Sequence, residues 1–76
     1  MEEVTYKGYT IELMSLALPE KTWRPRALLY YDRDGAMNTV PALSAPPDVT
    51  FPSEEEADRY AVAMAKRWID DHGTTP

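Results

Sequence analysis

The 76-residue chain contains no cysteine, one histidine and only three glycines, all isolated. Without cysteine it has no disulfide and no thiolate for catalysis or metal binding, and one histidine leaves little for a histidine-based metal site. Isolated glycines form no phosphate-binding loop. No apolar run is long enough to span a bilayer, and the acidic N-terminus lacks the apolar region of a signal peptide. We therefore expect a cytoplasmic, non-enzymatic protein without cofactor, metal or membrane contact.

Basic residues are also few: 8 Lys and Arg stand against 13 Asp and Glu, for a formal net charge of −5. Because affinity for polyanions rests on neutralising phosphates, this balance argues against nucleic-acid binding as the main activity. We expect residues 1–76 to form a single domain. A chain this short buries only about 60% of its unfolded surface, so helix–sheet packing or oligomerisation has to support it.

The most definite pattern predicts a helix over residues 53–72. Ser53 is a favoured N-cap, and Glu56 follows at capping-box spacing, in which the serine hydroxyl accepts from the Glu56 amide and the glutamate reaches back to the Ser53 amide. Gly73 can end the helix. An apolar stripe recurs at three-and-four spacing, and we interpret it as a core face, the alternative being a dimer seam or partner groove. It comprises Ala57, Tyr60, Ala61, Met64, Ala65, Trp68 and Ile69.

Polar residues of the same segment add weaker signals. Two pairs of opposite charge, Glu55 with Arg59 and Lys66 with Asp70, stand four residues apart, a spacing that supports a helix by about 0.2–0.5 kcal/mol per pair. His72 is expected to cap the helix C-terminus, where the dipole favours positive charge. The sequence offers no second catalytic group at a fixed spacing from it.

Residues 4–42 are expected to form the sheet. Residues 4–18 are the first strand candidate, but the apolar phase shifts after Leu13, which indicates a bulge near Ser15 or a strand end. Gly8 marks another irregular point. Residues 23–31 form the second strand, with Pro25 placing its start at an edge or bulge. Residues 32–35, Asp-Arg-Asp-Gly, predict a tight turn into a return strand over 36–42.

Residues 43–52 predict a proline-rich connector, in which residues 49–51 could add a short edge strand, and residues 73–76 predict a mobile tail. The fold class is α+β, a three- to four-stranded antiparallel meander packed on one face by a single C-terminal helix, β-β-β-(β)-α. The segments YKGYTIEL, WRPRALLYYDRDG and FPSEEEADRYAVAMAKRWID resemble a group of small bacterial proteins of uncharacterised function. The resemblance implies this fold and brings no activity.

One helix can cover only one face of the sheet, and strand alternation places Arg24, Arg26, Leu28 and Tyr30 together on one face of the second strand. With Trp23 at the strand start, these are the candidate interaction residues. Uncovered apolar surface usually marks an interface, and aromatic and arginine side chains are enriched there. We therefore expect a protein-interaction or accessory module whose partner is a second copy or an unknown protein.

Two other interpretations of this face stay open. Trp23 and Tyr30 could stack on bases while the arginines hold phosphates, which would make the chain a weak nucleic-acid-binding domain. Alternatively, the face could be solvated, with arginine stems covering apolar surface and no partner at all.

Overall fold

The computed structural model describes residues 3–72, apart from the side chains of residues 33 and 41; the predicted tail lies outside this range. In chain order the elements are β1 (Glu3–Tyr6), β2 (Tyr9–Leu13), β3 (Leu16–Ala17), β4 (Trp23–Arg24), β5 (Arg26–Arg33), β6 (Ala36–Ser44) and α1 (Glu54–His72). Strands β1, β2, β5 and β6 form, in that order, a four-stranded antiparallel sheet, and β3 pairs with β4. The predicted α+β meander with one C-terminal helix is confirmed.

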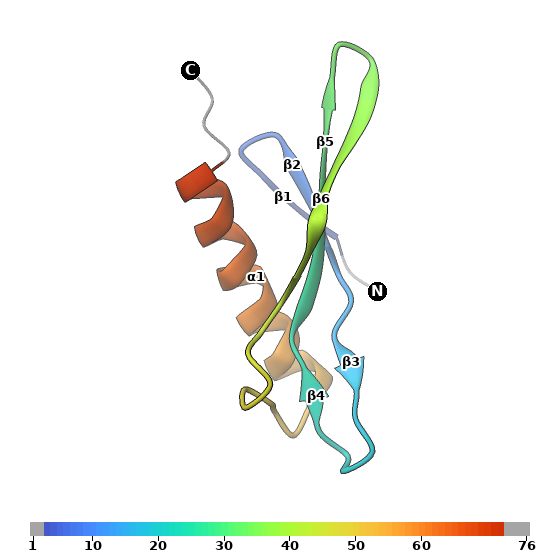
Figure 1. Cartoon of the computed structure of the whole chain (residues 1–76), viewed down its shortest axis with the longest axis vertical. Coiled ribbons are helices and arrows are strands. Elements are labelled where there is room, and N and C mark those ends of the chain that lie inside the picture. Colours follow the sequence, from blue (N-terminus) through green and yellow to red (C-terminus); the bar gives the residue numbers. More distant parts are fainter. Residues whose placement is uncertain (1–2, 73–76) are drawn as a thin grey trace.

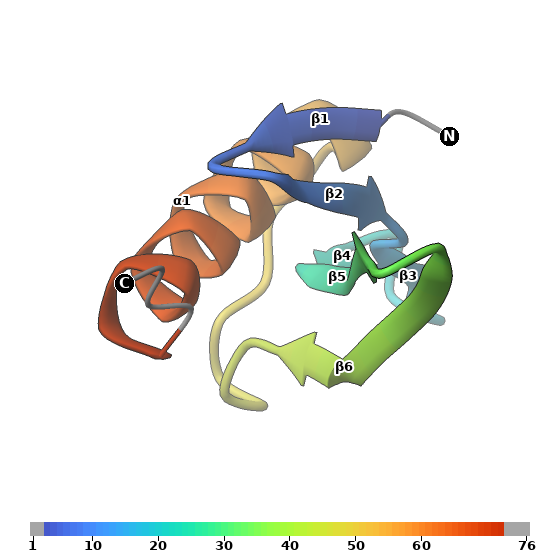
Figure 2. The same cartoon turned by 90° about the horizontal axis from the view of Figure 1, so that it is seen from above.

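The helix lies along one side of the sheet, and the β5–β6 and β3–β4 hairpins extend past it in opposite directions (Figure 1). Viewed from above, α1 lies on one side of the sheet and packs mainly against the two central strands, β2 and β5, while β1 and β6 form the edges (Figure 2). The radius of gyration is 12.9 Å, against about 11 Å for a compact domain of this length. The molecule is therefore elongated around a small core.

The predicted first strand over residues 4–18 is divided into three strands. Lys7 and Gly8 form a two-residue turn with φ of 49° and 84°, and Tyr6 pairs with Tyr9 across it. Two successive positive φ values are typical of the hairpin turn whose twist matches that of its strands. Gly8 thus marks a complete reversal of the chain. Asp34 and Gly35, with φ of 55° and 79°, form the predicted turn between β5 and β6.

Strands β2 and β3 pair with β5 and β4 as one long hairpin in a single register. Leu13 stands opposite Ala27, and Leu16, three residues later, stands opposite Arg24, three residues before Ala27. No residue is inserted, so the predicted bulge near Ser15 is wrong and the alternative, a strand end at Leu13, is correct. The apolar phase shifts because both faces of this hairpin carry apolar side chains.

Pro25 explains why the long hairpin is divided into two pairs of strands. The Met14 amide still donates to the Arg26 carbonyl at 2.9 Å, and the Ala45 amide donates to the Pro25 carbonyl at 3.1 Å. Pro25 itself has no N–H to donate, so the regular ladder is interrupted there. Its side chain is fully buried.

The return strand β6 runs to Ser44, two residues beyond its predicted end at 42. Its register against β5 shifts between Ala27 and Leu29. In the connector, Phe51 exchanges two backbone hydrogen bonds with Trp23, at 2.7 and 2.9 Å. The expected edge strand over 49–51 is therefore a single bridge at Phe51.

The helix begins as predicted. The Ser53 hydroxyl accepts from the Glu56 amide at 3.2 Å and donates to the Glu56 carboxylate at 3.1 Å. The Glu56 carboxylate thus accepts a hydrogen bond from the Ser53 hydroxyl, whereas the capping-box pattern predicted that it would accept one from the Ser53 amide. At the other end, the His72 ring lies 3.1 Å from the Trp68 carbonyl oxygen and stacks on the Trp68 ring. This is the predicted C-terminal cap.

The core lies between α1 and the helix-facing side of β2 and β5. Small residues of the helix stripe let the helix approach the sheet closely, and Ile69 adds the large contact from the helix. Tyr60, predicted as a core contact, is 36% exposed and packs on Phe51 instead. The buried core cluster comprises Ile11, Leu13, Ala27, Leu29, Ala61, Ala65 and Ile69.

Within residues 3–72, no helix has the length and apolar character needed to cross a membrane.

Candidate interaction face

The side of the sheet that faces away from α1 carries no covering element within residues 3–72, and we call it the outer face (Figure 2). Its members follow from alternation with the buried residues of β2 and β5 and from the strand register. They are Glu3, Thr5, Thr10, Glu12, Met14, Leu16, Arg24, Arg26, Leu28, Tyr30, Asp32, Met37 and Thr39.

Four of the five candidate residues predicted from sequence lie together on this face: Arg24, Arg26, Leu28 and Tyr30. The fifth, Trp23, alternates with Arg24 and so belongs to the helix-facing side, where its backbone pairs with the connector. The structure therefore places four of the five residues on one face of the sheet and Trp23 on the other.

The apolar part of the outer face is spread along the long hairpin. Leu28 is half-buried opposite Glu12, and Met14 is half-buried one pair of residues further along. Leu16 is 38% exposed. Met37, on the edge strand β6 opposite Asp32, is 66% exposed. Apolar side chains thus run along the length of the face without intrachain cover.

A tyrosine joins two acids in the middle of the outer face. Glu3 stands directly opposite Glu12 in the β1–β2 pairing, an arrangement in which like charges repel. The Tyr30 hydroxyl lies 3.3 Å from a carboxylate oxygen of each. Since a phenol has one proton, it can donate to only one of the two at a time. The site therefore retains unsatisfied acceptor capacity.

These surroundings raise the pKa of Tyr30 above its ordinary value of 10.0. Partial desolvation of the phenol is the largest cause, followed by the negative charges of Glu12 and Glu3. Tyr30 is thus a neutral hydrogen-bond donor at physiological pH.

The arginines of the outer face lie at the other end of the hairpin. Among the side chains that the structure describes, the ion pairs within 4 Å join Lys7 to Asp70 and Arg59 to Glu55, and neither involves Arg24 or Arg26. The Arg24 Nε is buried without a hydrogen-bond partner. The outer face therefore has a basic end and an acidic centre that are not paired with each other.

Sequence analysis missed Glu3 and Glu12 as members of this face. Glu3 could be placed beside Glu12 only once residues 3–6 were known to fold back on 9–12. The signal was Lys7-Gly8 between two tyrosines, which permits a two-residue hairpin turn.

The opposite side of the sheet holds a second cluster of polar and aromatic contacts. Asp70 accepts from Lys7 at 2.7 Å and from the Tyr6 hydroxyl at 3.0 Å. The predicted pairing of Asp70 with Lys66 is therefore replaced, and the Lys66 ammonium lies 5.1 Å from the centre of the Tyr6 ring. These contacts fasten the last turns of α1 to the β1–β2 turn.

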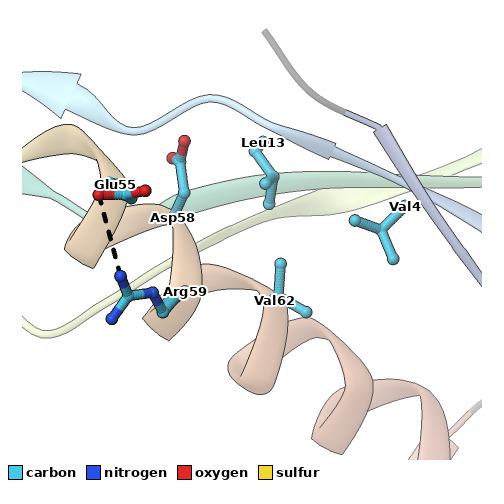
Figure 3. Close-up of a pocket in the computed structure, with 6 residues that line it drawn as sticks. All are labelled: Val4, Leu13, Glu55, Asp58, Arg59 and Val62. Carbon is cyan, nitrogen blue, oxygen red and sulfur yellow. Dashed lines mark ion pairs between the residues drawn. The ribbon is translucent and has the colours of Figure 1, made fainter.

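An open cavity of about 250 Å³ lies between β1, β2 and the first half of α1. Val4, Leu13 and Val62 point into it from the two sides (Figure 3). The charged groups at its rim already have partners: Asp58 accepts from the Ser15 hydroxyl at 2.6 Å, and the exposed Arg59 lies 3.9 Å from Glu55. The remaining lining side chains, Val4, Leu13 and Val62, are apolar.

Metal binding is not suggested by the described residues, which contain no group of three or more His, Asp or Glu side chains close enough to share an ion. The outer face offers carboxylates, guanidinium groups and apolar side chains on a rigid sheet. Such a surface is suited to binding through complementary charge and shape.

The chain belongs to a family described as a domain of unknown function, DUF6566, whose model matches residues 1–76. The predicted membership of a family of uncharacterised function is thus confirmed. No curated protein and no solved structure matches the chain.

Proposed function

We propose that this domain is a non-catalytic protein-interaction or accessory module that associates with a second copy of itself through the outer face. The observation that carries the proposal is the run of Met14, Leu16 and Leu28, which nothing in residues 3–72 covers, beside Arg24 and Arg26, which form no ion pair with the described side chains. Apolar surface of this kind on a small domain usually marks an interface, and arginine and methionine are among the residues enriched in interfaces.

The small core supports the same proposal. Among the described residues, five of the nine buried hydrophobic residues are alanines, and the largest fully buried side chains are Ile11, Leu29, Ile69 and Pro25. A domain of this size has a thin margin of stability, and burial of a second face would increase it. Self-association would thus supply the second layer that the chain lacks on its outer side.

Mass in solution as a function of concentration tests the proposal. The wild type is expected to change from one to two chains between micromolar and millimolar concentration in analytical ultracentrifugation. Leu28→Lys is expected to remain a monomer, because a charge replaces apolar surface in the centre of the face while Glu12 opposite keeps the new ammonium paired within the chain.

The matched control is Tyr60→Lys, on the helix surface away from the outer face. It is expected to dimerise like the wild type. A wild-type chain that stays a monomer throughout, or equal masses for the Leu28 and Tyr60 variants, would contradict self-association through this face.

Nucleic-acid binding is the second candidate, and the observation in its favour is the pair Arg24 and Arg26 on an open sheet face. Base stacking is less well supported, because Trp23 belongs to the other side and the Tyr30 hydroxyl lies between two carboxylates. Fluorescence anisotropy with a labelled single-stranded oligonucleotide at low salt would detect it. Binding that weakens with salt and with Arg24→Gln/Arg26→Gln would favour this alternative. Bacterial origin and cytoplasmic location stay predictions.

A further inference from the structure

Charges on the outer face are arranged in two perpendicular pairs. Arg24 and Arg26 follow each other along one strand direction, about 7 Å apart, whereas Glu3 and Glu12 stand side by side on neighbouring strands, about 5 Å apart. The arginine pair therefore runs along the strands and the glutamate pair runs across them. Both pairs project from the same side of the sheet.

These pairs do not neutralise each other within one chain. Arg26 and Glu12 are diagonal neighbours in the register, yet among the described side chains no ion pair within 4 Å joins them. Glu12 lies near the Tyr30 hydroxyl instead. The arginine pair and the glutamate pair are thus both available to a partner that presents the same pattern turned through about a right angle.

We propose that the partner is a second copy packed face to face with steeply crossed strands, so that Arg26 and Arg24 of each copy meet Glu12 and Glu3 of the other. The inference rests on the proposed self-association and specifies its geometry. Sheets that pack face to face prefer either nearly aligned or nearly perpendicular strands. The crossed arrangement turns the arginine pair of one copy onto the glutamate pair of the other.

The register also places the symmetry axis. Met14 stands opposite Arg26, and Glu12 stands opposite Leu28, so the four residues form the corners of a rectangle on the outer face, about 7 Å along the strands and about 5 Å across them. A two-fold axis that exchanges Arg26 with Glu12 runs close to the other diagonal. Met14 and Leu28 then each meet their own counterpart. The apolar residues therefore close the centre of the interface, and a two-fold axis makes every charge contact twice.

Two charge-reversed variants test this geometry. Arg24→Glu/Arg26→Glu gives an acidic face, and Glu3→Lys/Glu12→Lys gives a basic one. Each variant alone is expected to dissociate at least about tenfold more readily than the wild type, because like charges then face each other. Mixed in equal amounts, the two variants are expected to form a heterodimer with roughly the wild-type dissociation constant, measured by ultracentrifugation with one of them labelled.

The outcomes separate this inference from the proposed function. A wild type that never dimerises contradicts self-association itself. A wild-type dimer whose charge-reversed variants dimerise unchanged, or stay monomeric when mixed, contradicts the crossed geometry alone. Circular dichroism of each variant establishes that the fold is retained.

Single cysteines provide a second test that leaves the charges in place. The chain has no cysteine of its own, so Met14→Cys is expected to form an intermolecular disulfide under mild oxidation. Leu16→Cys, on the same face but far from the axis, is the matched control. Cross-linking of the Leu16 variant in preference to the Met14 variant would overturn the placement of the axis.

Discussion

The two faces of the sheet are built from alternate residues of the same strands, yet they are used differently. On the helix-facing side, Ile11 and Leu29 are fully buried beneath α1. On the outer side, their neighbours Glu12 and Leu28 lie half-buried without cover. The comparison shows that one helix supplies enough apolar surface for one face only. The other face is left with a mixture of apolar and charged side chains, among them the methionine and arginine side chains that the proposed interface uses.

The largest expected difference between the faces comes from two adjacent leucines. Leu29→Ala removes a fully buried side chain from the core cluster and is expected to lower the free energy of unfolding by about 2–5 kcal/mol. Leu28→Ala, one residue earlier on the outer face, is expected to cost about 1 kcal/mol or less at concentrations where the chain is monomeric. Urea unfolding of both variants measures the difference. Equal losses would mean that the outer face is part of the core.

The covered face also depends on the start of the helix. Ser53→Ala removes the hydroxyl that accepts from the Glu56 amide and is expected to destabilise the domain by about 0.5–2 kcal/mol. Ser44→Ala, at an exposed position at the end of β6, is the control and is expected to change little. Thermal unfolding of the two variants measures the difference. An unchanged melting curve for Ser53→Ala would contradict the assignment of Ser53 as the N-cap.

A smaller effect is expected where the end of the helix is fastened to the β1–β2 turn. Hydrogen bonds from Lys7 and Tyr6 hold the pKa of Asp70 below its ordinary value of 3.8. Because folding lowers this pKa, the stabilisation is present above pH 3.8 and is lost as the pH falls through the folded value. Asp70→Asn should therefore lower the melting temperature slightly near neutral pH and not in strong acid.

The stabilisation by the Lys7–Asp70 pair is also lost at high pH. The hydrogen bond from Lys7 to Asp70 and the negative charge of that carboxylate raise the pKa of Lys7 above 10.5. The contribution of Lys7 to stability is therefore present below pH 10.5 and is lost as the pH rises through the folded value. Both side chains are largely exposed, which keeps the effect small. Asp71→Asn, at the exposed neighbouring position, is the control. A difference between the Asp70 variant and wild type that persists at pH 2 would contradict the pairing.

The smallest expected effect lies on the outer face. Folding raises the pKa of Tyr30, so its contribution to stability is present below pH 10.0 and is lost as the pH rises through the folded value. In an alkaline absorbance titration, Tyr30→Phe should lose one tyrosine that ionises above pH 10.0. Glu12→Gln should make that tyrosine ionise earlier, because it removes one of the two charges. Loss of a tyrosine that ionises at or below pH 10.0 in Tyr30→Phe, or an unchanged titration curve in Glu12→Gln, would contradict the contacts of Tyr30 with the two glutamates.

Much of this fold could be predicted from sequence because its strongest signals are local. Ser53 with Glu56 marked the helix start, the alanine stripe marked the buried face, and Asp34-Gly35 marked the β5–β6 turn. Each depends on residues within a few positions of one another. Alternation along residues 24–30 likewise placed Arg24, Arg26, Leu28 and Tyr30 on one face before any strand pairing was known.

Long-range pairing accounts for what the sequence analysis got wrong. Residues 4–18 were interpreted as one strand because the turn at Lys7-Gly8 is short and its strands are brief. Asp70 pairs with Lys7, 63 residues earlier in the chain, in place of the lysine one helical turn away. Tyr60 fits the helical period but lies at the edge of the stripe, where the connector and not the sheet receives it.

The sequence by itself determined the helix with its N-cap, the turn at Asp34-Gly35 and which residues of the second strand share a face, because periodicity and capping are properties of neighbouring residues. Only the tertiary structure decided that Glu3 stands beside Glu12 and that Tyr30 lies between them. It also decided that the two arginines share this surface with both acids and that, among the described side chains, no ion pair joins them. Those relations depend on strand register, and register is set by contacts between segments far apart in the chain.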